Sequence, residues 1–161
     1  MEQSATLSDD GIYRYDLTRA WKEGATALWV MLNPSTADAD ADDPTVNAAV
    51  QFSEKAAGGR FGRVLIVNLF ALRTTSPARL KEHPDPVGPQ NDATIARLAA
   101  QADVVILGWG EQGALYPDRV QTVLRLLAGK PLYCLGTTAK RQPRHPQRLT
   151  RATPFIPFDV G

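Results

Sequence analysis

The fold is most strongly constrained by four apolar runs of strand length, at residues 27–32, 64–69, 104–107 and 132–135. Each run is continuously apolar instead of alternating, which is typical of strands that helices cover on both faces. Helix-like segments separate the runs, and strands that alternate with helices are joined by right-handed crossovers into a parallel sheet. The pattern predicts an α/β fold: a three-layer α/β/α sandwich with a mostly parallel four-stranded core sheet.

Three helices are predicted between these runs, from the spacing of their apolar residues. The first opens at Asp42/Asp43 and stops at residues 58–59, the second follows Asn91, and the third starts near Pro117. Aspartate and asparagine accept hydrogen bonds at helix starts, proline fits the first helical turn, and glycine ends a helix.

Residues 13–17 have a different pattern, because Tyr13, Tyr15 and Leu17 alternate with Arg14 and Asp16. Alternation is typical of a strand with one buried face, which occurs mostly in antiparallel pairs. We expect this segment to form an antiparallel N-terminal edge strand beside the first core strand, with the two tyrosines and Leu17 facing one way and the charged residues the other.

Length and composition suit one domain over residues 1–161. No stretch approaches the ~18–20 apolar residues that a membrane span needs, and the N-terminus lacks the basic and apolar parts of an export signal. The single cysteine, Cys134, cannot form an internal disulfide. We therefore expect a cytoplasmic protein that does not contact membranes.

The net charge of +1 conceals two segments of opposite charge. Residues 38–43 are rich in aspartate, whereas residues 140–151 are rich in arginine and contain no acid. A basic segment of this kind can bind phosphates, and Arg144 and Arg148 are the residues that we assign to such contacts. The alternative is a solvated segment that keeps the protein soluble.

The aspartates admit two interpretations. Asp38, Asp40 and Asp42 match alternate ligand positions of a calcium loop, but Asp43 stands where that loop needs glycine and Ala49 where it needs glutamate. Helix capping and solvation are favoured, with a magnesium site as the alternative. The chain also lacks a phosphate-binding glycine loop and a G-x-S-x-G elbow, so no cofactor is expected and kinase, dehydrogenase or serine-hydrolase chemistry is disfavoured.

The segments that follow the predicted strands are unusually polar. Ligands of open α/β sheets bind beyond the carboxyl ends of the strands, so these segments are the place to look for a site. Asn33 follows the first strand, Asn68 interrupts the apolar run of the second, and His145 lies beyond the fourth. Asn68 either ties a loop backbone or presents paired donor and acceptor groups to a planar ligand. Without further context, the favoured interpretation of Asn33 is an Asx-type turn, and that of His145 is an exposed histidine in a loop.

Taken in order, these segments resemble the bacterial and phage family called domain of unknown function 1643. The resemblance is carried by ALWVMLNPSTADADADDPT, VNLFALRTTSP, DPVGPQND, WG-x-x-GAL and RQPRHP, and it covers nearly the whole chain. The family name implies no activity.

The sequence is also similar, more distantly, to the uracil-DNA glycosylase superfamily. A first-strand loop with Asn-Pro, a second strand ending in asparagine, the run VVILG and a late His-Pro pair occur in the order of that superfamily. The resemblance implies a glycosylase-like fold in which Asn33 and His145 are catalytic and Asn68 reads the base. Three further side chains are assigned to substrate contacts: Phe70, Arg73 and Trp109.

The resemblance implies a nucleobase-recognising protein that hydrolyses an N-glycosidic bond in DNA or a nucleotide. The chain departs from the superfamily in lacking the glycine of the first loop, the serine after the His-Pro pair and the cysteines of an iron–sulfur cluster. Two alternatives stay open: a non-catalytic module that binds a nucleotide or nucleic acid, and a metal-dependent phosphoester hydrolase built on residues 38–43. If the first hypothesis holds, Asn33, Asn68 and His145 should line one pocket at the carboxyl edge of the sheet.

Overall fold

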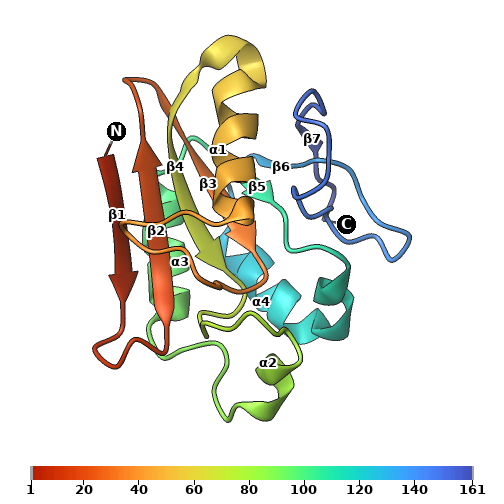
Figure 1. The fold of residues 1–161 in the computed structure, drawn as a ribbon. Coiled ribbons are helices and arrows are strands. Elements are labelled where there is room, and N and C mark those ends of the chain that lie inside the picture. The colour runs from red at the N-terminus through yellow and green to blue at the C-terminus, as the bar shows by residue number, and fades with distance from the viewer. Residues whose placement is uncertain (1, 161) are drawn as a thin grey trace.

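A mixed β-sheet of seven strands runs through the centre of the computed structural model, which describes residues 2–160 (Figure 1). The strands stand in the order β1-β2-β4-β3-β5-β6-β7. Their bounds are β1 Glu2–Leu7, β2 Arg14–Ala20, β3 Ala25–Met31, β4 Phe61–Asn68, β5 Val104–Leu107, β6 Leu132–Cys134 and β7 Ile156–Pro157. The four predicted core strands are confirmed as neighbours, since β4, β3, β5 and β6 are adjacent and parallel.

The complete sheet differs from the predicted four-stranded one, because antiparallel strands extend it at both ends. β7 pairs with β6, and β2 and β1 continue the sheet beyond β4. The predicted edge strand is therefore neither at the edge nor beside the first core strand. Both edges of β3 are already paired, with β4 and with β5, so β2 pairs with the free edge of β4 instead. The polar strand β1 then pairs with the outer edge of β2 and is itself the edge strand of the sheet.

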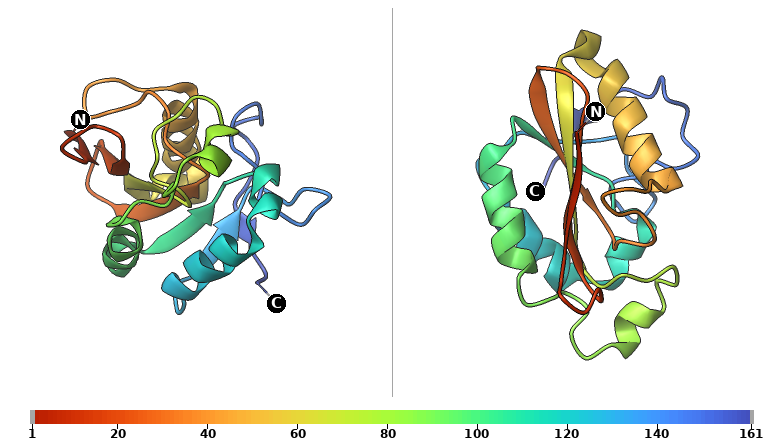
Figure 2. Two further views of the ribbon diagram at one scale, coloured as in Figure 1. Left: turned by 90° about the horizontal axis from the view of Figure 1, so that it is seen from below. Right: turned by 60° about the vertical axis from the view of Figure 1, so that its left-hand side comes forward.

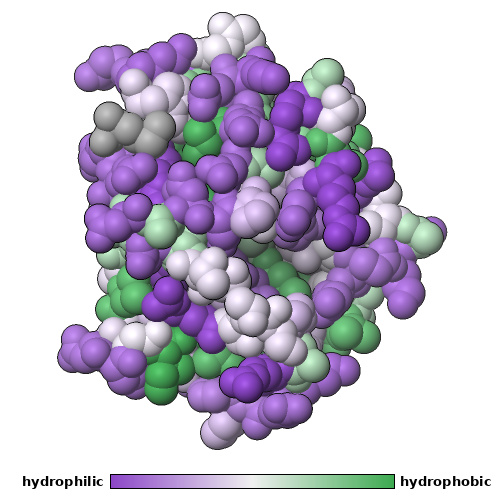
Figure 3. Space-filling view, in the orientation of Figure 1, coloured by the Kyte–Doolittle hydropathy of each residue, from purple (hydrophilic) through white to green (hydrophobic). Residues whose placement is uncertain are grey.

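Helices pack on both faces of the sheet (Figure 2). α1 (Pro44–Lys55) covers one face, and α3 (Asn91–Gln101) and α4 (Pro117–Leu126) cover the other. The short α2 (Arg79–Glu82) and the 3₁₀ helices η1 (Ala56–Gly59) and η2 (Glu111–Leu115) lie in connections. No helix among residues 2–160 has the length and apolarity that crossing a bilayer requires. The face seen in Figure 3 is largely hydrophilic, with apolar side chains showing in a recess near its centre.

The predicted start of α1 is confirmed in detail. The Oδ1 atom of Asp43 accepts a hydrogen bond of 2.9 Å from the backbone N–H of Val46, and Pro44 occupies the first turn. This carboxylate satisfies one of the backbone donors that a helix start leaves without partners. The cap therefore fixes where the loop after β3 becomes a helix.

A β-bulge changes the direction of side chains near the start of β2. Thr6 pairs with Asp16 and Leu7 with Arg14, so Tyr15 is an extra residue with no partner in β1. Asp16 faces α3, where its carboxylate lies 3.9 Å from Arg97, whereas Arg14 reaches the opposite face and donates to the carbonyl of Ala37. The predicted alternation is wrong here, because a bulge shifts the two-residue period of a strand by one residue.

The core beneath α1 contains a buried polar pair. Trp29 is fully buried on β3, and its indole Nε1–H donates to the hydroxyl of Ser53 over 2.9 Å. The bond matters because a buried donor without a partner has lost its hydrogen bond to water and gained none in the protein, which lowers the stability of the fold.

We predict that Ser53→Ala lowers the free energy of unfolding by about 1–3 kcal/mol, because it leaves the indole N–H without a partner. Urea unfolding monitored by tryptophan fluorescence measures the loss. Thr122→Ala, which removes an exposed helix hydroxyl, is the control and should change stability by less than about 0.5 kcal/mol. Equal effects of the two substitutions would contradict the importance of the buried bond.

Candidate functional site

A cavity of about 330 Å³ opens at the carboxyl ends of β3 and β4, beside the start of α1. The loop after β3, the end of β4, the loop after β5 and the segment around residue 145 all contribute to its wall. Asn33, Asn68 and His145, which are far apart in the chain, line it together, and so does Trp109. Four of the residues predicted from sequence thus converge on one space, as the parallel sheet requires.

Asn68 is buried, with 2% of its surface exposed, and its amide nitrogen Nδ2 has no hydrogen-bond partner in the protein. The main chain around it is held firmly. The side chain of Asn91 donates to the carbonyls of Asn68 and Leu69 over 3.0 and 3.2 Å, and Arg119 also donates to Leu69. The backbone of β4 is therefore fixed, whereas the side chain of Asn68, which lines the cavity, keeps an amide nitrogen that no protein group engages.

Asn33 is used mainly by the protein. Its Nδ2 donates to the carbonyls of Pro34 and Thr74 over 3.0 and 2.9 Å, which ties the loop after β3 to the loop after β4. This agrees with a loop-shaping role and leaves Oδ1 as the atom that can accept a hydrogen bond from a ligand or a water.

His145 reaches the cavity because its segment is attached to the loop after β5. The backbone N–H of Gly110 donates to the carbonyl of Pro143, and the indole of Trp109 donates to Gln142, both over 2.9 Å. Gly110 has a φ of +80°, and a Cβ there would lie 3.3 Å from the Cβ of His145, so glycine suits both the backbone conformation and the close packing.

The protonation of His145 follows from its neighbours. Nδ1 accepts a hydrogen bond from the backbone N–H of Gln147 over 3.1 Å, so a neutral imidazole carries its proton on Nε2. Burial lowers the pKa of His145 from its ordinary value of 6.5, and the negative charge of Asp43 opposes this in part. The ring is therefore neutral near pH 7 and offers Nε2–H as a donor.

The other predicted site residues lie elsewhere. Phe70 is buried on the α3 and α4 side, where its ring packs against Tyr116 at 4.7 Å, so its position is that of a core residue and not of a base-stacking one. Arg73 is half-buried, and Arg144 and Arg148 are exposed; none of the three lines the cavity. The polypeptide turns away after β4, which carries Phe70 to the opposite face.

The structure adds three charged groups that the sequence analysis did not assign to the site: Arg14, Asp43 and Glu111. Arg14 was expected on the other face of its strand, and only the bulge brings it here. Asp43 was expected as a helix cap, and the same position brings its carboxylate to the cavity wall. A β-bulge has no reliable sequence pattern, so Arg14 had no signal that could have revealed it.

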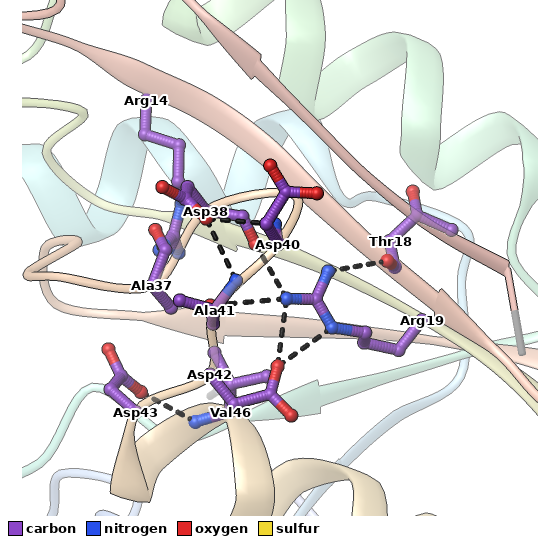
Figure 4. A network of polar contacts seen from close by, with 10 residues as sticks. All are labelled: Arg14, Thr18, Arg19, Ala37, Asp38, Asp40, Ala41, Asp42, Asp43 and Val46. Atoms are coloured by element: carbon purple, nitrogen blue, oxygen red, sulfur yellow. Dashed lines mark hydrogen bonds and ion pairs between the residues drawn. The ribbon is translucent and has the colours of Figure 1, made fainter.

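The remaining aspartates of residues 38–43 have local roles (Figure 4). Asp42 pairs with buried Arg19 over 2.8 Å, and Asp38 accepts hydrogen bonds from the backbone of Asp40 and Ala41, which lowers the pKa of Asp38. Within residues 2–160, no three carboxylate, histidine or cysteine side chains stand close enough together to hold a metal ion. The loop is thus organised by capping and by Arg19.

We predict that His145 titrates below pH 6.5, because its folded-state pKa is lowered by burial. His83→Gln leaves His145 as the sole imidazole of the chain, and NMR of its ring protons against pH measures the pKa. Between the two pKa values the unfolded chain binds more protons, so this group destabilises the fold as pH drops below 6.5 and has no effect above it. His145→Gln should remove that part of the pH dependence, and a pKa at or above 6.5 would contradict the prediction.

Comparison with known proteins identifies the family. Neither the curated proteins nor the solved structures contain a match to this chain. The model of one family, described as a protein of unknown function (DUF1643), matches residues 14–147, which include β2 to β6 and all four residues that converge on the cavity. The chain belongs to the DUF1643 family.

Proposed function

We propose that this protein recognises a nucleobase in the cavity at the carboxyl edge of its sheet, and that it hydrolyses the N-glycosidic bond of that base with a uracil-DNA glycosylase-like arrangement. The observation that carries the proposal is the unpartnered amide of Asn68. A buried amide donor without a partner costs about 1–3 kcal/mol, and a ligand that pairs with it recovers this energy. Nucleobases present a donor and an acceptor side by side, which is the complement of an amide.

The rest of the cavity supports a planar ligand. Met31, Ile66 and Trp109 add apolar surface to its wall, against which a planar ring can pack while the amide group selects the ligand. The volume of about 330 Å³ lies at the lower end of the range for small-molecule sites, which suits a ligand no larger than a mononucleotide.

The proposed reaction assigns a role to three side chains. Water bound by Oδ1 of Asn33 attacks the sugar carbon, and the carboxylate of Asp43 takes the proton that this water loses. The electrons of the broken bond pass to the base, and Nε2–H of His145 donates to the oxygen on which the negative charge collects. A carboxylate is needed in this scheme because an asparagine cannot accept a proton.

Binding without hydrolysis is the second candidate. It is favoured by the two hydrogen bonds that already engage Asn33, which leave that side chain little freedom to follow a reaction. A metal-dependent hydrolase is disfavoured, because the carboxylates of Asp38 and Asp42 are engaged by other groups of the protein.

We predict that Asn68→Leu weakens base binding while leaving the fold as stable as before or more stable. Leucine removes a buried polar group that has no partner, so the free energy of unfolding should stay the same or rise by about 1 kcal/mol. Base affinity should drop at least roughly 10-fold, because two hydrogen bonds to the ligand are lost. Calorimetry with uracil, thymine, cytosine, adenine and guanine measures binding, and Asn47→Ala, at an exposed position of α1, is the control. A clear loss of stability would mean that the protein itself uses the amide.

Turnover is tested with oligonucleotides and nucleotides that carry the base selected by calorimetry, scored for abasic sites and for released base. Asp43→Asn should lower the rate at least roughly 100-fold, as expected for loss of a general base, with base affinity unchanged. Binding with no release of base from any substrate would leave the second candidate as the function.

A further inference from the structure

A buried arginine stands in the wall of the same cavity without a full set of partners. Arg14 has 2% of its surface exposed, and its Nη1 donates to the carbonyl of Ala37 over 3.0 Å. Its Nε is buried without a hydrogen-bond partner, and among residues 2–160 no carboxylate lies within ion-pair distance of it. A guanidinium has five N–H donors in a planar fork, so most of the binding capacity of this group is unused.

A comparison with Arg19 on the same strand shows how unusual this is. Arg19 is equally buried, but it pairs with Asp42 at 2.8 Å and donates to the carbonyls of Thr18, Asp38 and Ala41 (Figure 4). The protein thus satisfies one buried guanidinium of β2 and leaves the other open at a cavity. Buried charges are normally paired, because water no longer solvates them.

Arg14 remains a cation in this place. Burial lowers its pKa to about 10, and the charge of Asp43 opposes that effect. The carboxylate of Asp43 is itself engaged by the N–H of Val46 and by the hydroxyl of Ser35. The cation is therefore only partly compensated at the place where the β-bulge turns it toward the cavity.

We infer that Arg14 forms an anion subsite of the cavity, and that the ligand is a nucleoside monophosphate whose base meets Asn68 and whose phosphate meets Arg14. This inference rests on the proposed recognition of a base. A guanidinium fork matches a phosphate with two parallel hydrogen bonds, which is why arginine is so common in phosphate sites.

A terminal phosphate fits this subsite better than the backbone of a polymer. The phosphodiester of DNA or RNA continues in both directions and needs an open groove, whereas Arg14 is almost wholly enclosed. The exposed Arg144 and Arg148 lie outside the cavity and are the side chains that a polymer would meet first.

The test compares the free base, its nucleoside, its nucleoside 5′- and 3′-monophosphates, inorganic phosphate and a short oligonucleotide by calorimetry. The wild-type protein should bind one monophosphate roughly 10- to 100-fold more tightly than the nucleoside, as charge-assisted bonds provide. Arg14→Met should remove that difference and leave nucleoside affinity within about threefold, since the base contacts are retained. Arg14→Lys keeps the charge but not the fork and should give an intermediate loss.

Stability gives an independent readout. Arg14→Met should lower the denaturant midpoint only slightly, because the buried charge that it removes has no ion-pair partner and gives a single hydrogen bond, to the carbonyl of Ala37. Arg19→Met is the matched control and should lower the midpoint clearly, since it leaves Asp42 and three carbonyls without their donor.

Failure of this inference is distinguishable from failure of the proposed function. Equal affinity for nucleoside and monophosphate, or an equal loss of both in Arg14→Met, would overturn the anion subsite and leave base recognition standing. Tighter oligonucleotide binding that depends on Arg144 and Arg148 but not on Arg14 would also overturn it, in favour of a polymer. Phosphate binding that depends on Arg14, without any affinity for bases, would support the subsite and overturn the proposed function.

Discussion

The parallel pairing of β3 with β4 on one side and β5 on the other is the constraint on which the site depends. In this register Met31 lies opposite Asn68 and Val30 opposite Leu107, so the three strands end at nearly the same level. The loops that follow them therefore start side by side, whatever their separation along the chain. Hydrogen bonds from Leu69 and Phe70 to the carbonyls of Met31 and Leu32 extend this order into the loops.

Polar side chains hold the backbone around these strand ends. Asn91 and Arg119 bind the carbonyls at the end of β4, Asn33 joins two loops, and Arg19 organises the acidic loop before α1. Two buried groups at the cavity, the amide of Asn68 and the guanidinium of Arg14, are left with donors unused. A rigid backbone that carries unsatisfied side chains is prepared for a ligand, because the cost of ordering the site is met during folding.

The neutral imidazole of His145 is a further hydrogen-bond donor at the cavity. Its Nδ1 is engaged by the backbone of Gln147 and its ring is mostly withdrawn from water, so the free nitrogen is a donor at neutral pH. Asn68, Arg14 and His145 thus bring hydrogen-bond donors to the cavity wall, and Asp43 and Glu111 bring carboxylates. The proposed ligand, a base with a phosphate, would place its acceptor oxygens against these donors.

Some features could be predicted from the sequence: the apolar runs, the helix cap at Asp43 and the polar ends of the strands. Each depends on a local preference that the tertiary structure did not override. Continuous apolar runs alternating with helices determine parallel neighbours, and parallel neighbours bring Asn33, Asn68 and His145 to one edge. The pairing of β2 with β4, the edge position of β1 and the bulge at Tyr15 were decided only in three dimensions, since they depend on which side of a strand is left free and on where a register slips. The position of Arg14 was also decided in three dimensions. The alternation of its neighbours in the sequence indicates one face of the strand, whereas the one-residue bulge at Tyr15 places its side chain on the other face.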